Sequence, residues 1–156
     1  MSGPGQGEMA AAMRRLADEA ACRELVLRAA ALADAGQGDA LALLFTADAR
    51  LTRPNGVELR GRGAIARAYG DRPAHRLTVH LVCGTVFDDF GHDRARAVTR
   101  VLLWAADDRA DSGPQGRPAE GRQIVGRFVD HFVRTEEGWR IDERVACFDL
   151  HTPDPA

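Results

Sequence analysis

The sequence predicts an α+β fold, with helices that cover one face of a curved antiparallel sheet. Two observations support this prediction. The first part of the chain is rich in alanine, leucine and arginine, which favour helices. The last part contains four long strand-like runs in succession, which are typical of a meander of antiparallel strands: 76–88, 93–106, 121–135 and 138–149.

The length of 156 residues suits one domain and leaves little room for a second. We expect a disordered N-terminus over 1–7, where glycine, proline and serine dominate, a single domain over 8–150, and a short tail over 151–156. The net charge is −2, and basic and acidic residues are mixed throughout. No basic face is apparent, so the sequence favours neither a nucleic acid nor an anionic membrane as a partner.

Three helices are expected before the long strands. Residues 8–34 predict one long helix, and Gly36 supplies its C-terminal stop. The segment "GDALALLF" (38–45) predicts a second, short helix with Asp39 as its N-cap. A third helix is expected over 61–70.

Between the second and third helices, Pro54-Asn55-Gly56 lies between two short alternating runs, which predicts a small hairpin. The connection over 107–120 is long and polar, and it is expected to form a mobile loop or a lid. Both faces of the last two runs carry apolar residues, whereas one layer of helices covers only one face of a sheet. We therefore expect a homodimer that forms through the outer face of the sheet.

Cofactor and metal sites are not indicated. The sequence has no GxGxxG, no Walker loop, no GxSxG and no HExxH. His75 and His80 are five residues apart on one strand, so their side chains face opposite sides and do not share a metal. The three cysteines are widely spaced and are expected to be free, buried thiols. With no apolar leader and no run of about 20 apolar residues, we expect a cytoplasmic protein.

Asp34 and His80 are the first two candidate site residues. Asp34 ends an apolar stripe of the long helix, Leu27-Ala31-Asp34, at the negative end of the helix dipole. This unfavourable position for a carboxylate makes a histidine partner plausible, although a solvated last-turn acid is the ordinary alternative. His80 lies in the first long run, with the small residue Gly84 four positions on.

Asp130 is the third candidate, within "IVGRFVDHFVR" (124–134). Strand alternation places it on the same side as Phe128 and Phe132, and it places His131 on the other side. Burying a charge costs several kcal/mol unless the charge is paired or neutralised. Either Asp130 faces a working cavity, or it is a structural acid bound by an arginine such as Arg144 or Arg100.

Four segments, in the right order, resemble the SnoaL-like proteins of the nuclear-transport-factor-like superfamily. They are "ALADAGQGDALALLFTADARL" (31–51), "GVELRGRGAIARAY" (56–69), "RLTVHLVCGTVF" (76–87) and "GRFVDHFVRTEEGWRIDERV" (126–145). The resemblance implies a cone, in which a strongly curved sheet and the long N-terminal helix enclose a pocket, with two short helices beside it. It is specific for the fold and weakly specific for the reaction.

The resemblance also implies roles for particular residues. In the branch that includes scytalone dehydratase, a helix aspartate and a strand histidine form a catalytic dyad, which matches Asp34 and His80. In the polyketide cyclases, an acid deep in the pocket acts as acid or base, which matches Asp130. The pocket is then expected to be lined by side chains near these three: Leu27, Ala31, Gly84, Phe128 and Phe132.

The departures from the family pattern mean that neither the dehydratase nor the dehydrochlorinase activity is transferred to this chain. Ala33 and Ala29 stand where related dehydratases and dehydrochlorinases have a tyrosine and a lysine, and Phe128 replaces the usual tyrosine. We therefore expect a cofactor-independent lyase, isomerase or cyclase that acts on a hydrophobic, oxygenated small molecule such as a polyketide-like metabolite. The alternatives are a non-catalytic small-molecule-binding or scaffold protein, and the small β subunit of an aromatic-ring dioxygenase.

Overall fold

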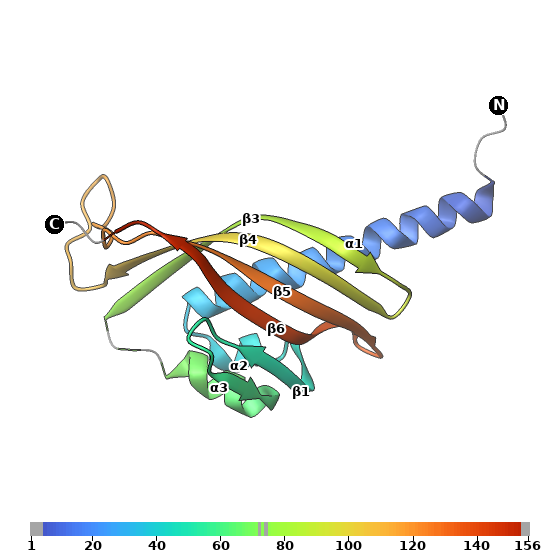
Figure 1. Cartoon of the computed structure of the whole chain (residues 1–156), viewed down its shortest axis with the longest axis horizontal. Coiled ribbons are helices and arrows are strands. Elements are labelled where there is room, and N and C mark those ends of the chain that lie inside the picture. Colours follow the sequence, from blue (N-terminus) through green and yellow to red (C-terminus); the bar gives the residue numbers. More distant parts are fainter. Residues whose placement is uncertain (1–4, 72, 74, 154–156) are drawn as a thin grey trace.

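The computed structural model describes residues 5–71, 73 and 75–153, and it confirms the predicted α+β class (Figure 1). The helices are α1 (Gln6–Asp34), α2 (Gly38–Ala42) and α3 (Gly61–Gly70). The strands are β1 (Phe45–Thr52), β2 (Glu58–Arg60), β3 (Arg76–Phe90), β4 (Arg94–Asp107), β5 (Ile124–Thr135) and β6 (Gly138–His151).

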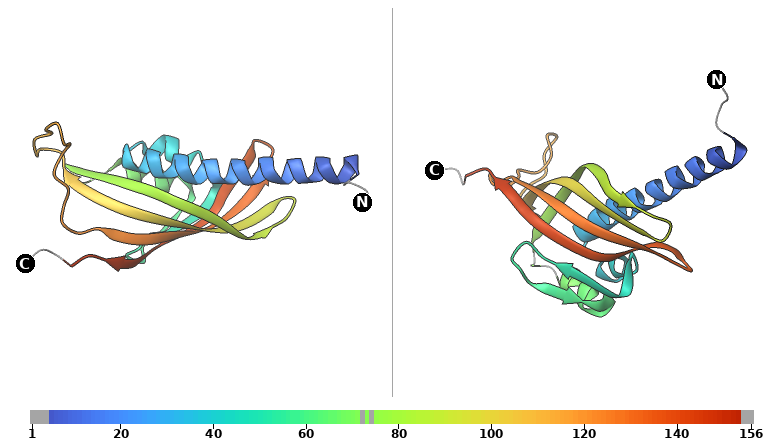
Figure 2. Two further views of the ribbon diagram at one scale, coloured as in Figure 1. Left: turned by 90° about the horizontal axis from the view of Figure 1, so that it is seen from above. Right: turned by 45° about the vertical axis from the view of Figure 1, so that its right-hand side comes forward.

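The strands form one curved, open sheet in the order β2-β1-β6-β5-β4-β3. Strands β3 to β6 make the predicted antiparallel meander, and β1 and β2 make the predicted small hairpin. Strand β1 joins the edge of the meander by pairing parallel to β6. The three helices lie on one side of this sheet, so its inner face is covered and its outer face is not (Figure 2).

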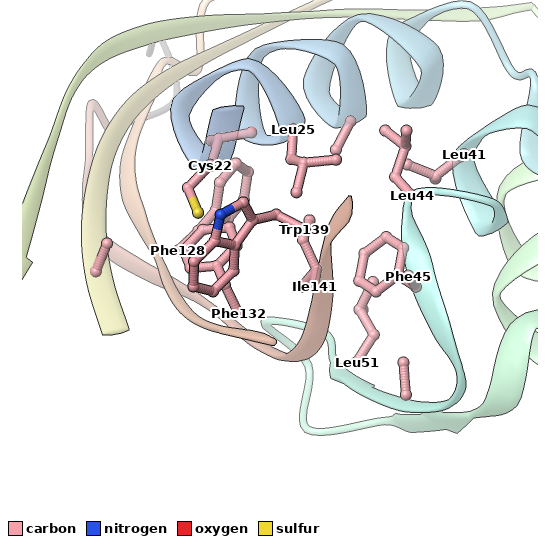
Figure 3. Packing of buried hydrophobic residues seen from close by; sticks show 14 of the residues in the cluster. Cys22, Leu25, Leu41, Leu44, Phe45, Leu51, Phe128, Phe132, Trp139 and Ile141 are labelled. Atoms are coloured by element: carbon pink, nitrogen blue, oxygen red, sulfur yellow. The ribbon is translucent and has the colours of Figure 1, made fainter. Parts of the chain in front are cut away.

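The core lies between α1, the inner face of the sheet and the β1 region (Figure 3). On α1 the buried residues are Cys22, Leu25, Val26, Ala29 and Ala30. They recur at helical spacing and form the face that packs on the sheet. On the sheet side, the largest fully buried apolar side chains are Phe45, Leu51, Phe132 and Ile141.

The helix boundaries differ from the prediction at two places. Helix α1 begins at Gln6, inside the segment expected to be disordered, because the backbone N–H of Gly5 donates to the Glu8 carboxylate at 3.1 Å and caps the first turn. Residues 1–4 of that segment, and 154–156 of the expected tail, lie outside the described residues. Helix α2 is shorter than expected, because buried Phe45 starts β1 beside Ile141 of β6.

The cysteines are all free, but they are not all buried as expected. Cys22 is buried, Cys147 is half-buried and Cys83 is exposed. Cys83 lies at a β-bulge of β3, where the pairing register with β4 shifts between Val82 and Gly84. No helix among the described residues is long and apolar enough to cross a membrane.

Candidate functional site

A cavity of about 280 Å³ lies between the C-terminal half of α1, helix α3, the β1–β2 turn and the inner face of the sheet. Most of its wall is apolar, with alanines from α1 and large side chains from the strands. The residues with polar side chains that line it are Arg53, Tyr69, Arg76, Thr78, His80, Arg144 and Cys147. A cavity with a mainly apolar wall and a few convergent polar groups is typical of a small-molecule site.

Asp34 and His80 are in direct contact at the wall of this cavity. The Oδ1 atom of Asp34 lies 2.6 Å from Nδ1 of His80, and its Oδ2 accepts the backbone N–H of His80 at 2.7 Å. Thr78 donates its hydroxyl to Oδ1 at 2.9 Å. The carboxylate therefore holds both the ring and the backbone of His80. In the described part of the chain, Nε2 of His80 makes no hydrogen bond, and the ring lines the cavity.

The position of Asp34 on α1 explains why it reaches His80. Ala30, one turn earlier, is buried on the cavity side, so Asp34 lies at the edge of the buried helix face. The predicted lining residues Leu27 and Ala31 fall on the other side of that edge. In contrast to the prediction, both are exposed, Leu27 by 49%, and the helix lines the cavity with its alanines instead.

Strand β3 brings Thr78 and His80 to the inner face by ordinary alternation. The alternation does not continue to Gly84, because the bulge after Val82 shifts the following residues by one. Gly84 is consequently exposed and does not line the cavity, in contrast to the prediction. Thr85 turns inward in its place and contacts the buried Thr99 hydroxyl at 2.8 Å.

Asp130 faces inward, as the alternation of β5 predicted, but it does not line the cavity. Its side chain is fully buried, and its two oxygens accept hydrogen bonds from Nε and Nη2 of Arg144 at 2.6 and 2.7 Å. Arg144 comes from β6, where its Cα is paired with that of Asp130. The group that the pair presents to the cavity is therefore the Arg144 guanidinium, and the carboxylate lies behind it.

Phe128 connects the two charged pairs. Its ring lines the cavity as predicted, with the guanidinium carbon of Arg144 at 4.3 Å and the His80 ring centroid at 6.1 Å from its centroid. Phe132, four residues on, was also predicted to line the cavity, but it lies in the core and packs against Phe87 instead. The aromatic side of β5 is thus shared between the site and the core.

Tyr69 of α3 is a cavity residue that sequence reasoning missed. Burial raises the pKa of its phenol, and the charges of Arg144 and Arg53 partly oppose this rise, so the hydroxyl stays protonated and able to donate at neutral pH. The only available signal was that it is the single tyrosine of the chain, which does not place it in the fold. Among the described residues, no group of three or more His, Cys, Asp or Glu side chains is arranged to hold a metal ion.

Burial alone raises the pKa of Asp34, but the hydrogen bonds from the ring and backbone of His80 and from Thr78 outweigh it, and the pKa lies below its usual value of 3.8. A carboxylate with a lowered folded-state pKa stabilises the protein above the unfolded value, and this contribution is lost as the pH falls through the folded value. We expect the urea midpoint of the wild type to fall between about pH 5 and pH 2 more steeply than that of Asp34→Asn. Equal slopes for the two proteins would contradict the lowered pKa.

Comparison with known proteins agrees with this architecture. Residues 14–145 match the model of the SnoaL-like domain family. The fold is similar to that of a type 2 hexachlorocyclohexane dehydrochlorinase (LinA), with a TM-score of 0.77 and 18% identity over 92% of this chain and 93% of that chain. The fold is also similar to that of the LinA-type3 enzyme of Novosphingobium barchaimii LL02, with a TM-score of 0.73 and 17% identity over 90% of this chain and 92% of that chain.

An NTF2-like protein with a cystatin-like fold from Novosphingobium aromaticivorans is also similar, with a TM-score of 0.73 and 24% identity over 94% of this chain and 92% of that chain. At these identities the likeness to solved structures shows the fold alone. No curated protein matches the chain.

Proposed function

The chain belongs to the SnoaL-like domain family, and from this premise we propose that it is a cofactor-independent lyase, isomerase or cyclase. The substrate is a hydrophobic, oxygenated small molecule with a carbon acid beside a carbonyl group. The observation that carries the proposal is the 2.6 Å contact between Asp34 and His80 on the wall of a mainly apolar cavity. Folds similar to this one occur in dehydrochlorinases, which are enzymes.

His80 is the proposed general base. When Asp34 accepts a hydrogen bond from Nδ1–H, the tautomer is fixed and Nε2 carries the lone pair that faces the cavity. Nε2 takes a proton from the carbon beside the carbonyl, and the C–H electron pair forms an enolate. Asp34 stabilises the imidazolium that results. Such general-base help is worth on the order of 10²–10⁴-fold.

Arg144 is the proposed partner of the enolate oxygen. Two of its nitrogens donate to Asp130, whereas Nη1 makes no hydrogen bond within the described residues. A guanidinium held in this way is a preorganised donor at the place where negative charge develops. We assign Asp130, expected from the sequence to act as an acid, to the positioning of Arg144.

Three outcomes are open to the enolate, and they correspond to the three reaction classes. Return of the proton to another carbon gives an isomerase. Expulsion of a leaving group from the neighbouring carbon gives a lyase, and attack on a second carbonyl of a polyketide-like chain gives a cyclase. The common step is removal of the proton by His80, so a test of that step does not depend on which reaction follows.

The experiment uses tetralone, a bicyclic ketone of a size suited to a cavity of about 280 Å³. In deuterated buffer, the protein is expected to accelerate the replacement of the hydrogens beside the carbonyl by deuterium, as measured by mass spectrometry. If tetralone binds and is not exchanged, the enzymatic proposal fails and the small-molecule-binding alternative takes its place.

We also propose that the protein forms a homodimer through the outer face of the sheet. A row of apolar residues crosses four strands there, because the Cα atoms of Leu81, Leu102, Val125 and Leu150 are paired in succession. Leu81 and Leu150 are exposed, as are Leu77 and Val79 next to them. An apolar row of this length on an open face is typical of an interaction surface.

Leu81→Asp is expected to convert the dimer into a monomer, because it places a charge in the apolar row of the interface. The measurement is light scattering at micromolar protein concentration. Leu43→Asp is the control, since Leu43 is also an exposed leucine but lies at the end of α2, away from this face. A wild-type protein that is already monomeric would contradict the proposal.

A further inference from the structure

The charges on the cavity wall are unevenly compensated. The wall contains four basic side chains, those of Arg53, Arg76, His80 and Arg144, and within the described residues it contains no Asp or Glu. Three of the four side chains contact the carboxylate of an Asp or Glu that does not itself line the cavity. Arg144 has Asp130, His80 has Asp34, and Arg76 has Glu120 at 3.6 Å.

Arg53 is the exception. No ion pair of its guanidinium with an acid is present in the part of the chain that the structure describes, and its charge faces the cavity from the exposed side. Since an arginine is always protonated near neutral pH, the mouth of the cavity carries a positive charge that no described carboxylate pairs.

The local backbone holds Arg53 at this place. It begins the turn between β1 and β2, where its N–H donates to the Val57 carbonyl at 2.9 Å and its carbonyl accepts from Gly56 at 2.8 Å. Gly56 has a φ of 83°, a left-handed conformation that favours glycine. The guanidinium carbon lies 5.9 Å from the ring centroid of Tyr69, so the side chain is directed over α3 at the rim.

We propose that the substrate of this site is a carboxylic acid whose carboxylate is bound by Arg53 at the mouth of the cavity, while its apolar ring system fills the interior. The inference rests on the proposed function for the location of the reacting carbon, and it adds the chemical class of the substrate. The substrate carboxylate supplies the counter-charge that no described carboxylate gives to Arg53. Arg53 binds it by charge-assisted hydrogen bonds, next to the ring of Tyr69.

The geometry separates binding from chemistry. Arg144 and His80 both lie against Phe128, in the interior, whereas Arg53 lies against Tyr69 at the rim. A substrate held by its carboxylate at the rim therefore presents the other end of its ring system to His80. Arg53 is a specificity-determining residue in this arrangement, and it takes no part in the transfer of the proton.

The test compares two probes of the same shape, naphthoate and the neutral naphthamide, by titration calorimetry. The wild type is expected to bind naphthoate about five- to tenfold more tightly than naphthamide, as for a partly exposed charge-assisted hydrogen bond. Arg53→Gln is expected to abolish this preference while binding naphthamide as the wild type does. Thermal unfolding of Arg53→Gln, a turn residue on the surface, establishes that the variant is folded.

Arg60→Gln is the matched control, because Arg60 is exposed on the same hairpin, pairs with Glu58 and does not line the cavity. It is expected to keep the full preference for the acid. The proposal is overturned if the wild type does not prefer the acid, if Arg53→Gln keeps the preference, or if Arg60→Gln loses it equally. His80→Ala is expected to keep the preference as well, so failure of the proton-transfer mechanism and failure of this inference give different results.

Discussion

His80→Ala is expected to reduce the rate of deuterium exchange into tetralone by about 10²–10⁴-fold, the usual contribution of a positioned general base. The reason is that the other polar groups of the lining residues are weaker bases than a neutral imidazole: three guanidiniums, a protonated phenol, a hydroxyl and a thiol. Binding of tetralone is expected to be little changed, because the apolar part of the wall is intact. The loss therefore falls on the rate constant rather than on the affinity.

The control for this substitution is His131→Ala. His131 is exposed on the opposite side of β5, next in sequence to Asp130 but facing away from the cavity. It is expected to leave the exchange rate unchanged. If His80→Ala retains the wild-type rate, or if both histidine variants lose activity equally, His80 is not the base.

Asp34→Asn is expected to reduce the rate of deuterium exchange less than His80→Ala does. The reduction is expected to be larger than the loss of the negative charge alone would cause. The carboxylate accepts from the Thr78 hydroxyl, the His80 backbone N–H and the His80 ring. An asparagine has one acceptor oxygen and one donor NH2, so either orientation of the amide directs its NH2 at a donor. The ring of His80 is then expected to be displaced, as well as to lose its counter-charge.

The Asp34–His80 pair could be anticipated from the sequence, because each residue is unusual in its own element. Asp34 is a carboxylate at the negative end of a helix, and strand alternation already showed that His131 cannot partner Asp130. The sequence does not predict where a β-bulge shifts the pairing register of two strands. The bulge after Val82 turns Gly84 outward, and nothing in the local residue pattern indicates it.

The inner face of α1 was not predictable for a related reason. The helix carries apolar residues on two faces, and Leu27-Ala31 belongs to the exposed one, whereas Val26 and Ala30 belong to the buried one. With alanine and leucine on both sides, hydrophobic spacing alone does not choose between them. The choice is made by packing on the sheet, whose strand β3 contacts the end of the helix through His80, 46 positions from Asp34.

The cavity groups Tyr69 and Arg53 depend on the same long-range assembly. They come from α3 and from the β1–β2 turn, and only the parallel pairing of β1 with β6 brings these elements beside the meander. A parallel pairing leaves no turn signal in the sequence, because the two strands are far apart along the chain. The residues that give the site its specificity are for this reason the least predictable ones.

The largest effect on stability is expected at Asp130. Asp130→Ala is expected to lower the free energy of unfolding by about 3–5 kcal/mol, because it leaves the Arg144 guanidinium, only 4% exposed, buried without its counter-ion. Urea unfolding measures the change. Asp149→Ala is the control, since Asp149 also pairs with arginines, Arg100 and Arg127, but on the partly exposed side of the sheet. Its loss is expected to cost about 1 kcal/mol or less.

A double substitution separates the structural and functional roles of the buried pair. Asp130→Val with Arg144→Met removes both charges and fills the space with apolar side chains, so stability is expected to return to within about 1–2 kcal/mol of the wild type. The exchange of tetralone is nevertheless expected to stay low, because the donor for the enolate oxygen is absent. If Asp130→Ala lowers the free energy of unfolding no more than Asp149→Ala does, the Asp130–Arg144 pair does not have the proposed stabilising role. A double variant with full exchange activity would refute the role of Arg144, since the base His80 alone would then suffice.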